Sequence, residues 1–413
     1  MIIGAGAAGI AAARALIARR FEVVIVEAAG RIGGRAYTES TIFGAPYDHG
    51  CASLQGPRAL PHVGLAHQLG FTLHDHASAG DVLFVGNRRA TLAEQDARAQ
   101  AWNRITTALN SAKDDVAAAE VTVRGDPMAA LVETWIGPMD FGVDFDALST
   151  RDWNADADAD AGHDHDYLVK QGLGTLVARL GDGLPIAFNC AATALDWSGA
   201  GVTVETSRGS IAARACIVTV STGVLASGAI RFTPGLPDWK AAAIAAVPMG
   251  CLAKIGLRFD GARFGLSAND YLSYTPENRV SAAACYFLTF PTDHDYVVGY
   301  VGGCFGRDLA CAGPAAAIDF ALAEFERMVG STARRHFVSG HLSEWESNPL
   351  TRGAYAAARP GQSAARADLA RPLGDRLFFA GEAMAYPHFA LCSGAHISGE
   401  HTAADVAAKL SEM

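Results

Sequence analysis

The pattern of apolar and polar positions predicts a β–α–β unit at the start of the chain. Residues 7–20 are rich in alanine, with Leu16 and Ile17 among them, and predict a helix. The segment FEVVIVE (21–27) is almost continuously apolar, which is typical of a parallel strand buried on both faces. Only the short apolar segment MII precedes the helix. A strand normally has five or six residues, so we expect that the natural chain begins a few residues earlier.

The same pattern predicts further elements along the chain. The alternation over 201–221 predicts two or three strands, and CLAKIGLRF (251–259) and RLFFAGE (376–382) each predict one strand. Residues 92–115 and 394–410 predict helices. Residues 314–330 predict another helix that starts at Pro314 and places Ile318, Leu322, Phe325 and Val329 on one face. The acidic stretch NADADADAGHDHD (154–166) predicts a loop. Strands and helices in this order indicate an α/β fold.

Composition limits the class of protein. The chain has 413 residues, of which 50% are hydrophobic and 18% are charged, so we expect a large core in about two domains. The net charge of −10 argues against nucleic acid as a partner, because phosphate binding needs clustered Lys and Arg. No apolar run is long enough to span a bilayer, and we expect neither a signal peptide nor a membrane partner.

The cysteine pattern indicates an intracellular protein. None of the eight cysteines form a C-x-x-C pair, so the sequence predicts neither a zinc site nor a redox motif. We therefore expect reduced thiols, no bound metal and a cytoplasmic location.

Three glycines near the start fit the dinucleotide-binding pattern G-x-G-x-x-G. Gly4 permits the tight turn, Gly6 lets backbone N–H groups approach a pyrophosphate, and Gly9 lets the helix pack on the sheet. Glu27 ends the next strand and can accept hydrogen bonds from ribose hydroxyls. A glycine-rich turn with no ligand is the alternative, and the strand–helix–strand context argues against it.

The segment after Glu27 favours FAD over a nicotinamide. EAAGRIGGRAY provides a second close backbone approach at Gly33 and Gly34, and Arg31 and Arg35 add positive charge for the pyrophosphate. The sequence has no second G-x-G-x-x-G that would bind NAD(P)H.

These motifs resemble the flavin-containing amine oxidase family, which includes monoamine oxidases, polyamine oxidases and lysine-specific histone demethylases. The resemblance extends over YDHGCASLQG (47–56), the segment that ends in CLAKIGLRF, EWESNPLTRGAYAAARPG (344–361) and DRLFFAGEAMAYPHFALCSGAHISG (375–399). It implies a Rossmann-like, three-layer ββα FAD-binding domain interleaved with an α+β substrate domain. We expect the FAD-binding domain to comprise 1–75, 167–238 and 348–413, and the substrate domain to comprise 76–166 and 239–347.

The resemblance also implies which residues contact the cofactor. Ala354 stands where covalent monoamine oxidases have a cysteine, so we predict non-covalent FAD. The helix that begins near Ser393 would direct its N–H groups at the flavin carbonyl O2. The implied FAD contacts are Gly4, Gly6, Ala7, Ala8, Gly9, Glu27, Ala28, Arg31, Gly33, Gly34, Arg35, Ala192, Trp345, Gly381, Glu382, Leu391 and Cys392.

Two residues are implied as catalytic. Lys254 matches the family lysine that hydrogen-bonds through a water to flavin N5, and a lysine that reaches solvent from an edge strand is the alternative. Tyr355 matches one wall of an aromatic cage for the amine, with a core tyrosine as the alternative. The opposite wall falls at Leu391, which is not aromatic. Gln55 and Phe389 are the implied substrate-pocket residues.

The implied reaction is the oxidation of an amine. Hydride would pass from the α-carbon to flavin N5, water would hydrolyse the imine, and molecular oxygen would be reduced to hydrogen peroxide. Three alternatives remain. One is an L-amino-acid oxidase, which needs an arginine for the substrate carboxylate. The others are a desaturase or dehydrogenase that shares the FAD domain, and a non-enzymatic flavin-binding module. The sequence leaves open the amine, the electron acceptor and the oligomeric state.

The acidic run between 154 and 166 has three interpretations. Its spacing matches no calcium or zinc loop, although its ligand types would allow a metal. It could also form a rim that attracts polyamines. A solvated loop is the interpretation that the composition favours. Its candidate residues are Asp156, Asp158, Asp160, His163, Asp164, His165 and Asp166.

Overall fold

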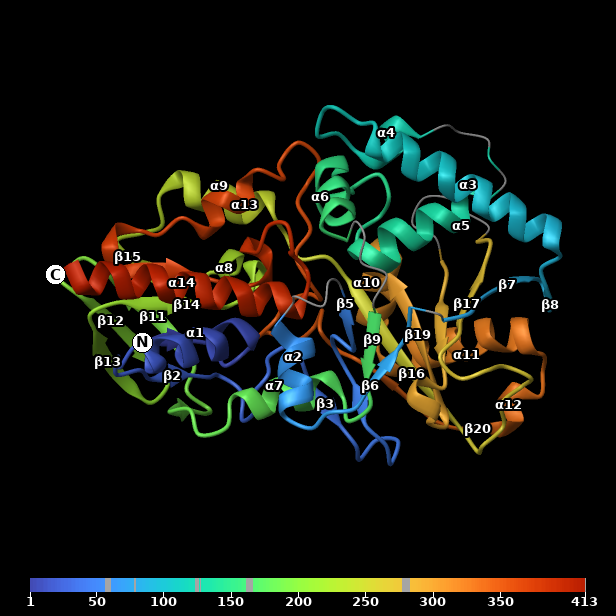
Figure 1. Cartoon of the computed structure of the whole chain (residues 1–413), viewed down its shortest axis with the longest axis horizontal. Helices are drawn as coiled ribbons and strands as arrows, with labels where there is room; N and C mark the ends of the chain where they lie inside the picture. The colour runs from blue at the N-terminus through green and yellow to red at the C-terminus, as the bar shows by residue number, and fades with distance from the viewer. Residues whose placement is uncertain are drawn as a thin grey trace.

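Two large sheets and the helices around them make up the fold (Figure 1). The computed structural model describes residues 1–55, 61–77, 79–122, 126, 128–160, 166–276 and 283–412. The sheet that carries the N-terminal strand lies at the left of Figure 1, near both chain ends, and the second large sheet lies at the right.

A parallel sheet of five strands contains the start of the chain. The short N-terminal strand is central in it and pairs with a neighbour on each side. The strand predicted over 21–27 is regular only at Ile25 and Val26. The order across the sheet is β10 (Ile186–Ala187), β2 (Ile25–Val26), β1 (Ile2–Ile3), β14 (Cys216–Val218) and β21 (Leu377–Phe379).

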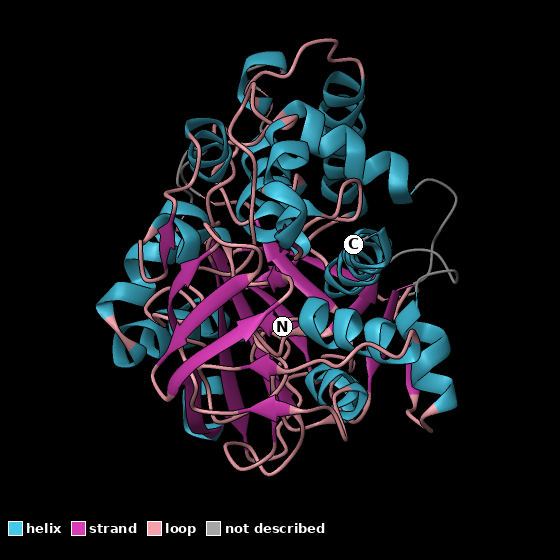
Figure 2. Ribbon diagram, turned by 90° about the vertical axis from the view of Figure 1, so that its left-hand side faces the viewer, coloured by secondary structure: helices cyan, strands magenta, loops and turns pink. Residues whose placement is uncertain are grey.

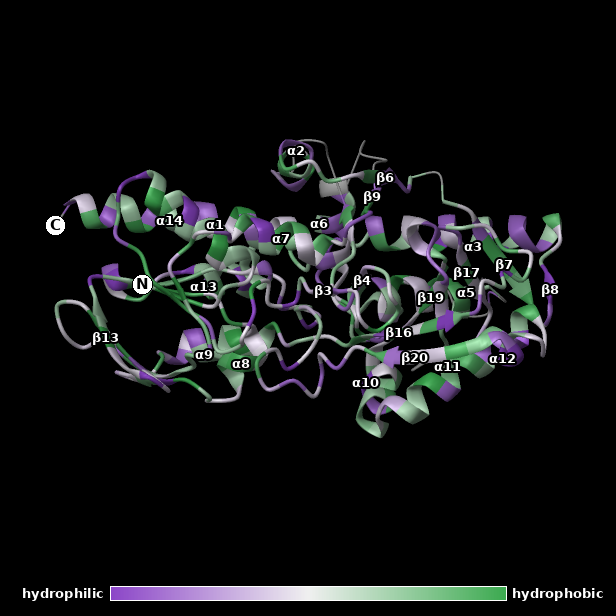
Figure 3. Cartoon of the chain, turned by 90° about the horizontal axis from the view of Figure 1, so that it is seen from below, coloured by the Kyte–Doolittle hydropathy of each residue, from purple (hydrophilic) through white to green (hydrophobic). Residues whose placement is uncertain are grey.

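Successive residues of β1 face two different layers, because side chains alternate along a strand. Ile2 packs with the helices α1 (Ala7–Ala18) and α14 (Cys392–Glu412). Ile3 packs with a second sheet on the opposite face (Figure 3). The expected three-layer ββα arrangement is therefore present. The second sheet has the order β13 (Gly209–Ala213), β12 (Val202–Thr206), β11 (Ala192–Asp196) and β15 (Arg231–Thr233).

The other large sheet has seven strands and is antiparallel except between β17 and β7. Helix α11 (Pro314–Val329) covers one of its faces, with Leu322 and Phe325 fully buried and Ile318 and Val329 partly buried. The order is β20 (Phe337–Leu342), β16 (Leu252–Phe259), β19 (Tyr296–Gly302), β18 (Tyr286–Thr289), β17 (Tyr271–Tyr274), β7 (Asp81–Val85) and β8 (Arg88–Arg89).

Further helices gather at the top of Figure 1. The helix predicted over 92–115 ends at Asn110. Among these helices is a π-helix that contains Pro138, a residue that argues against a helix in the sequence. They are α3 (Leu92–Asn110), α4 (Ala118–Val121), α5 (Ala129–Thr134), the π-helix Trp135–Phe141 and α6 (Thr150–Asp160).

The acidic stretch is not a loop in its first half, so that prediction is wrong there. Helix α6 runs through Asp160, and its start is capped by the Ser149 hydroxyl, which accepts a hydrogen bond from the Asp152 N–H. Alternating Asp and Ala hide the helical period, although alanine is the strongest helix former. His163, Asp164 and His165 lie outside the described residues, and Asp166 begins β9 (Asp166–Val169). In the described part of the chain, no cluster of side chains is suited to a metal ion.

Figure 2 shows the strands gathered in the lower half of the molecule with helices above and beside them. The predicted domain division stays a prediction. Helix α9 (Asp238–Ala246) begins at its boundary at 238 and packs with the core of the five-stranded sheet.

Within the described ranges, no helix is both long and apolar enough to cross a bilayer. The remaining elements are β3 (Thr38–Glu39), β4 (Tyr47–Asp48), β5 (Ser53–Gln55), α2 (Pro61–Gln68), β6 (Leu73–Asp75), α7 (Leu173–Leu180), α8 (Thr222–Ala226), α10 (Gly303–Ala312), α12 (Ala333–His336), α13 (Ala365–Ala370) and three 3-10 turns, Pro291–Asp293, Gly374–Arg376 and Glu382–Met384.

Candidate active site

One cavity of about 690 Å³ brings together the residues that the sequence singled out. It is lined by strands of both large sheets, by the starts of α1 and α14, and by the π-helix. Every predicted cofactor, catalytic and substrate residue lines it except Gly9. Gly9 acts in packing, because a Cβ at this position would lie 2.0 Å from the Gly4 carbonyl oxygen.

The glycine turn has the geometry of a pyrophosphate site. Gly4 has φ +105°, which a residue with a side chain rarely adopts, and Gly6 caps α1 without a side-chain hydrogen bond. The first N–H groups of a helix have no acceptor within the helix, and the helix dipole makes this end positive. The start of α1, at Ala7 and Ala8, lines the cavity, so an anion there would meet unpaired donors.

The RIGGR segment folds back onto this turn. The Gly33 N–H donates to the Ala5 carbonyl at 2.9 Å, and a Cβ at Gly34 would come within 3.4 Å of the Gly6 Cα. Both Gly33 and Gly34 have positive φ. The second glycine pair therefore serves close backbone packing, and Arg31 and Arg35 line the same part of the cavity.

Glu27 is held in place by the backbone. Its Oε2 accepts from the Ala5 N–H at 2.7 Å, and its Oε1 accepts from the Ala29 N–H at 2.8 Å. The carboxylate is buried and lines the cavity at the end of β2. Each oxygen can accept a second hydrogen bond, so the group suits a ribose diol.

These features fit FAD by their donor chemistry. Glycines leave room for close backbone approach, two helices, α1 and α14, begin at the cavity, and Arg31 and Arg35 add charge. At α14, Cys392 and Ala395 line the cavity, and the chain that enters the helix includes Leu391. The start of α14 is therefore suited to stabilise negative charge on a bound ring.

Lys254 points into the cavity from the interior of the seven-stranded sheet. Its neighbours Ala253 and Ile255 lie in the core on the α11 side, so strand alternation directs Lys254 to the opposite face. Strand β16 lies between β20 and β19, which rules out a lysine that reaches solvent from an edge strand. The ammonium donates to the Asp48 carbonyl at 3.3 Å. Burial lowers the pKa of Lys254, and the Asp48 carboxylate opposes this shift.

Aromatic side chains line the other end of the cavity. Tyr355 is half-buried rather than part of the core, and its hydroxyl donates to the Met139 carbonyl at 3.4 Å. Trp135 from the π-helix meets Tyr271 edge to face, with ring centroids 5.6 Å apart. Tyr300 lies opposite Lys254, with the ammonium 5.7 Å from its ring centroid.

Sequence reasoning missed several cavity residues. Burial, and then the Asp140 carboxylate, raise the pKa of Tyr355. Asp156 reaches the cavity because the acidic stretch is helical. No periodic signal marks the π-helix, which supplies four of these residues. The missed residues at this end are Trp135, Met139, Asp140, Phe141, Tyr271 and Tyr300, whereas Asp156 belongs to the acidic run for which the sequence offered a polyamine-attracting rim as one interpretation.

The comparisons with known proteins agree with this site. A profile of the flavin containing amine oxidoreductase family matches residues 7–407. Polyamine oxidase 4 of Oryza sativa subsp. japonica is 29% identical, over 97% of this chain and 86% of that protein. Probable polyamine oxidase 4 of Arabidopsis thaliana is 30% identical, over 97% of this chain and 85% of that protein. Human lysine-specific histone demethylase 2 is 24% identical, over 99% of this chain and 53% of that protein.

Solved structures share the fold at lower identity. Putrescine oxidase bound to putrescine superposes with a TM-score of 0.81 at 21% identity, over 98% of each chain. Cyclohexylamine oxidase from Brevibacterium oxydans IH-35A gives a TM-score of 0.78 at 23% identity, over 99% of this chain and 98% of that one. The family profile, the relatives and the cavity agree that this chain belongs to the flavin containing amine oxidoreductase family and is an FAD-dependent amine oxidase.

Proposed function

We propose that the protein oxidises the α-carbon of a diamine or polyamine, with hydrogen peroxide as the second product. The observation that carries the substrate class is that two carboxylates, Asp140 and Asp156, line the same cavity as the aromatic residues. Two carboxylates there suit a ligand with a second ammonium group at a distance from the reacting nitrogen. The names of the polyamine oxidase and putrescine oxidase relatives support this choice.

The side chains of the cavity divide the work between them. FAD, when bound, supplies the two-electron acceptor for the C–N oxidation. Tyr355 and Trp135 offer ring faces to the reacting end of the amine and exclude water from it. The carboxylates of Asp140 and Asp156 attract the distal ammonium. Lys254, with its lowered pKa, holds or releases a proton at Nζ next to the Asp48 carbonyl.

The alternatives fit the cavity less well. An L-amino-acid oxidase needs an arginine for the substrate carboxylate, yet among the described residues the arginines that line the cavity are Arg31 and Arg35, beside the glycine turn. Arg35 is already paired with Glu382 at 2.8 Å. A desaturase for apolar substrates would not need two carboxylates in the pocket, because a charged group is unfavourable beside an apolar ligand that excludes water from it.

Substituting the pocket carboxylates tests the substrate class. We expect Asp140→Asn and Asp156→Asn each to raise the Kd of putrescine, measured by anaerobic flavin reduction, about tenfold, which corresponds to about 1.4 kcal/mol. The Kd of butylamine, which has no second ammonium group, should change less than twofold. Asp158→Asn is the matched control, because Asp158 lies on the same helix but is exposed outside the cavity. Equal effects on putrescine and butylamine would contradict the diamine proposal.

The attachment of FAD gives a second test. Ala354 lines the cavity where covalent relatives have a cysteine, so we expect acid precipitation to release all of the flavin into the supernatant. Flavin fluorescence that stays with the polypeptide on a denaturing gel would contradict this. In that case the cavity thiols Cys51 and Cys392 would be compared by single substitution to alanine.

A further inference from the structure

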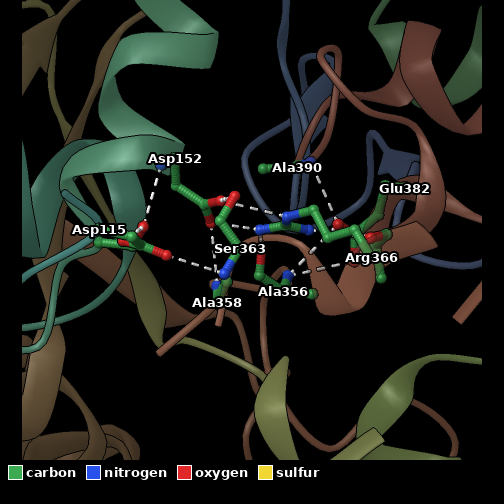
Figure 4. Close-up of polar contacts among 10 residues, drawn as sticks. Asp115, Asp152, Ala356, Ala358, Ser363, Arg366, Glu382 and Ala390 are labelled. Atoms are coloured by element: carbon green, nitrogen blue, oxygen red, sulfur yellow. Dashed lines mark hydrogen bonds and ion pairs between the residues drawn. The ribbon is translucent and has the colours of Figure 1, made fainter. Parts of the chain in front are cut away.

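Asp152 and Arg366 form a buried ion pair (Figure 4). The Arg366 Nη2 donates to the Asp152 Oδ2 at 2.6 Å, and each side chain is only 1% exposed. Arg366 belongs to α13 and Asp152 to α6, so the pair joins segments 214 residues apart. Neither residue lines the cavity.

The remaining donors of Arg366 reach the cavity wall from behind. Nη2 also donates to the Ala356 carbonyl at 3.2 Å, next to Tyr355, and Nη1 donates to the Ala383 carbonyl at 2.9 Å. The guanidinium carbon lies 3.9 Å from the ring centroid of Phe389, close enough for a cation–π contact. The Arg366 guanidinium therefore contacts Phe389 directly, and it binds the carbonyl of Ala356, the residue that follows Tyr355.

Asp152 connects the same group to the helix that carries a pocket carboxylate. Residues i and i+4 share one face of a helix, so Asp152 fixes the face of α6 from which Asp156 reaches the cavity. Both Asp152 oxygens are fully used, because they also accept from the Ser363 hydroxyl at 2.6 Å and from the Ala358 N–H at 3.0 Å. Several hydrogen bonds therefore fix the orientation of the Asp152 carboxylate.

The wall segment needs such support. Ala390, next to Phe389, has φ +62°, a left-handed conformation that costs a residue with a Cβ about 1 kcal/mol. A buried ion pair is a poor source of net stability, since an apolar pair of similar volume often serves as well. The guanidinium contributes geometry rather than stability, because its planar group of N–H donors holds several partners in one plane.

We infer that Arg366 is a positioning residue for amine oxidation, which holds Tyr355, Phe389 and Asp156 in their places around the bound substrate. The inference rests on the proposed function for its assignment of the substrate wall. A displacement of about 1 Å at a reacting centre can lower a rate about 100-fold, so a loosened wall should affect the reductive half-reaction first.

The test compares Arg366→Lys with wild-type holoenzyme in anaerobic stopped flow. We expect the limiting rate of flavin reduction by putrescine, per bound flavin, to fall about 10- to 100-fold. Flavin content and the rate of reoxidation by oxygen should stay within twofold of wild type. Arg334→Lys is the control, because Arg334 forms ion pairs with Asp319 and Glu326 near the surface and does not line the cavity.

A double variant, Asp152→Leu with Arg366→Met, keeps the volume apolar and removes the buried charge. It should retain flavin and unfold near the wild-type temperature, yet show the same slow reduction. An unchanged reduction rate in either variant overturns the inference, and so does loss of flavin in both, because Arg366 would then act on the fold alone. If putrescine does not reduce wild-type flavin but benzylamine does, the diamine proposal fails and the Arg366 comparison is made with benzylamine.

Discussion

Substituting Lys254 with methionine is expected to lower kcat for amine oxidation by about 100-fold or more. A positioned proton donor or acceptor typically contributes a factor of about 10² to 10⁴. Lys254 is the only lysine among the described residues that line the cavity, and its ammonium donates to the Asp48 carbonyl at 3.3 Å. Methionine keeps the length of the side chain and removes a buried charge, so the fold should persist. Steady-state peroxide formation and the two half-reactions in stopped flow measure the effect.

The pH dependence of the free energy of unfolding tests independently whether the pKa of Lys254 is lowered in the folded protein. Burial lowers its pKa from the ordinary 10.5, so between the two pKa values the unfolded chain binds more protons than the folded one. Stability contributed by this residue therefore rises with pH through that window. Relative to Lys254→Met, the wild-type free energy of unfolding should increase as pH approaches 10.5. Lys113→Met is the control for the pH dependence, because Lys113 is exposed.

For the activity measurement, a loss of kcat of less than threefold in Lys254→Met would contradict the catalytic role of Lys254.

Removing the Glu382 carboxylate is expected to have the largest effect on stability. Glu382 is buried and pairs with Arg35 at 2.8 Å, and it accepts from the N–H groups of Ala356 and Ala390. Glu382→Ala leaves a charge and two backbone donors without this partner. Breaking a buried pair costs about 3–5 kcal/mol, and because the Arg35 side chain is 24% exposed we expect about 3 kcal/mol.

Chemical unfolding of the holoenzyme measures this loss, and a flavin titration of the apoprotein measures the accompanying rise in Kd for FAD. Glu326→Ala is the matched control, because its pair with Arg334 is partly exposed and should be worth less than about 1 kcal/mol. Equal losses of unfolding free energy in the two variants would show that the contacts of Glu382 with Arg35, Ala356 and Ala390 do not stabilise this part of the cavity.

The predictions that succeeded rest on local chemistry. The turn at Gly4 and the packing contact at Gly9 are required by backbone sterics within one β–α–β unit, and the structure has both. The ribose-binding role of Glu27 stays a prediction, although its carboxylate lines the cavity. The predicted fold class is confirmed for the same reason, because continuous apolar strands and a glycine turn leave few alternatives. The catalytic roles of Lys254 and Tyr355 stay predictions, although both line the cavity.

The predictions that failed concern segments whose pattern is ambiguous. Alternating Asp and Ala in α6 suggested a loop, but the Ser149 cap and alanine propensity make a helix. The π-helix carries Pro138, so its contribution of Trp135 and Asp140 had no sequence signal. In α6 the local cap and the alanine propensity decided the conformation, although the alternating pattern hides the helical period. In the π-helix local preference opposes the conformation, because Pro138 lies inside it.

The sequence by itself indicated FAD, because the glycine turn, Glu27 and the RIGGR segment need only neighbouring residues with a fixed spacing. Tertiary structure decided which side chains join Tyr355 and Phe389 in the cavity. Asp156 enters the pocket only because α6 is a helix with a particular face inward, and Arg366 meets Asp152 across 214 residues. Such meetings depend on how helices and sheets dock, and docking is set by the shapes of many buried side chains at once rather than by any short motif.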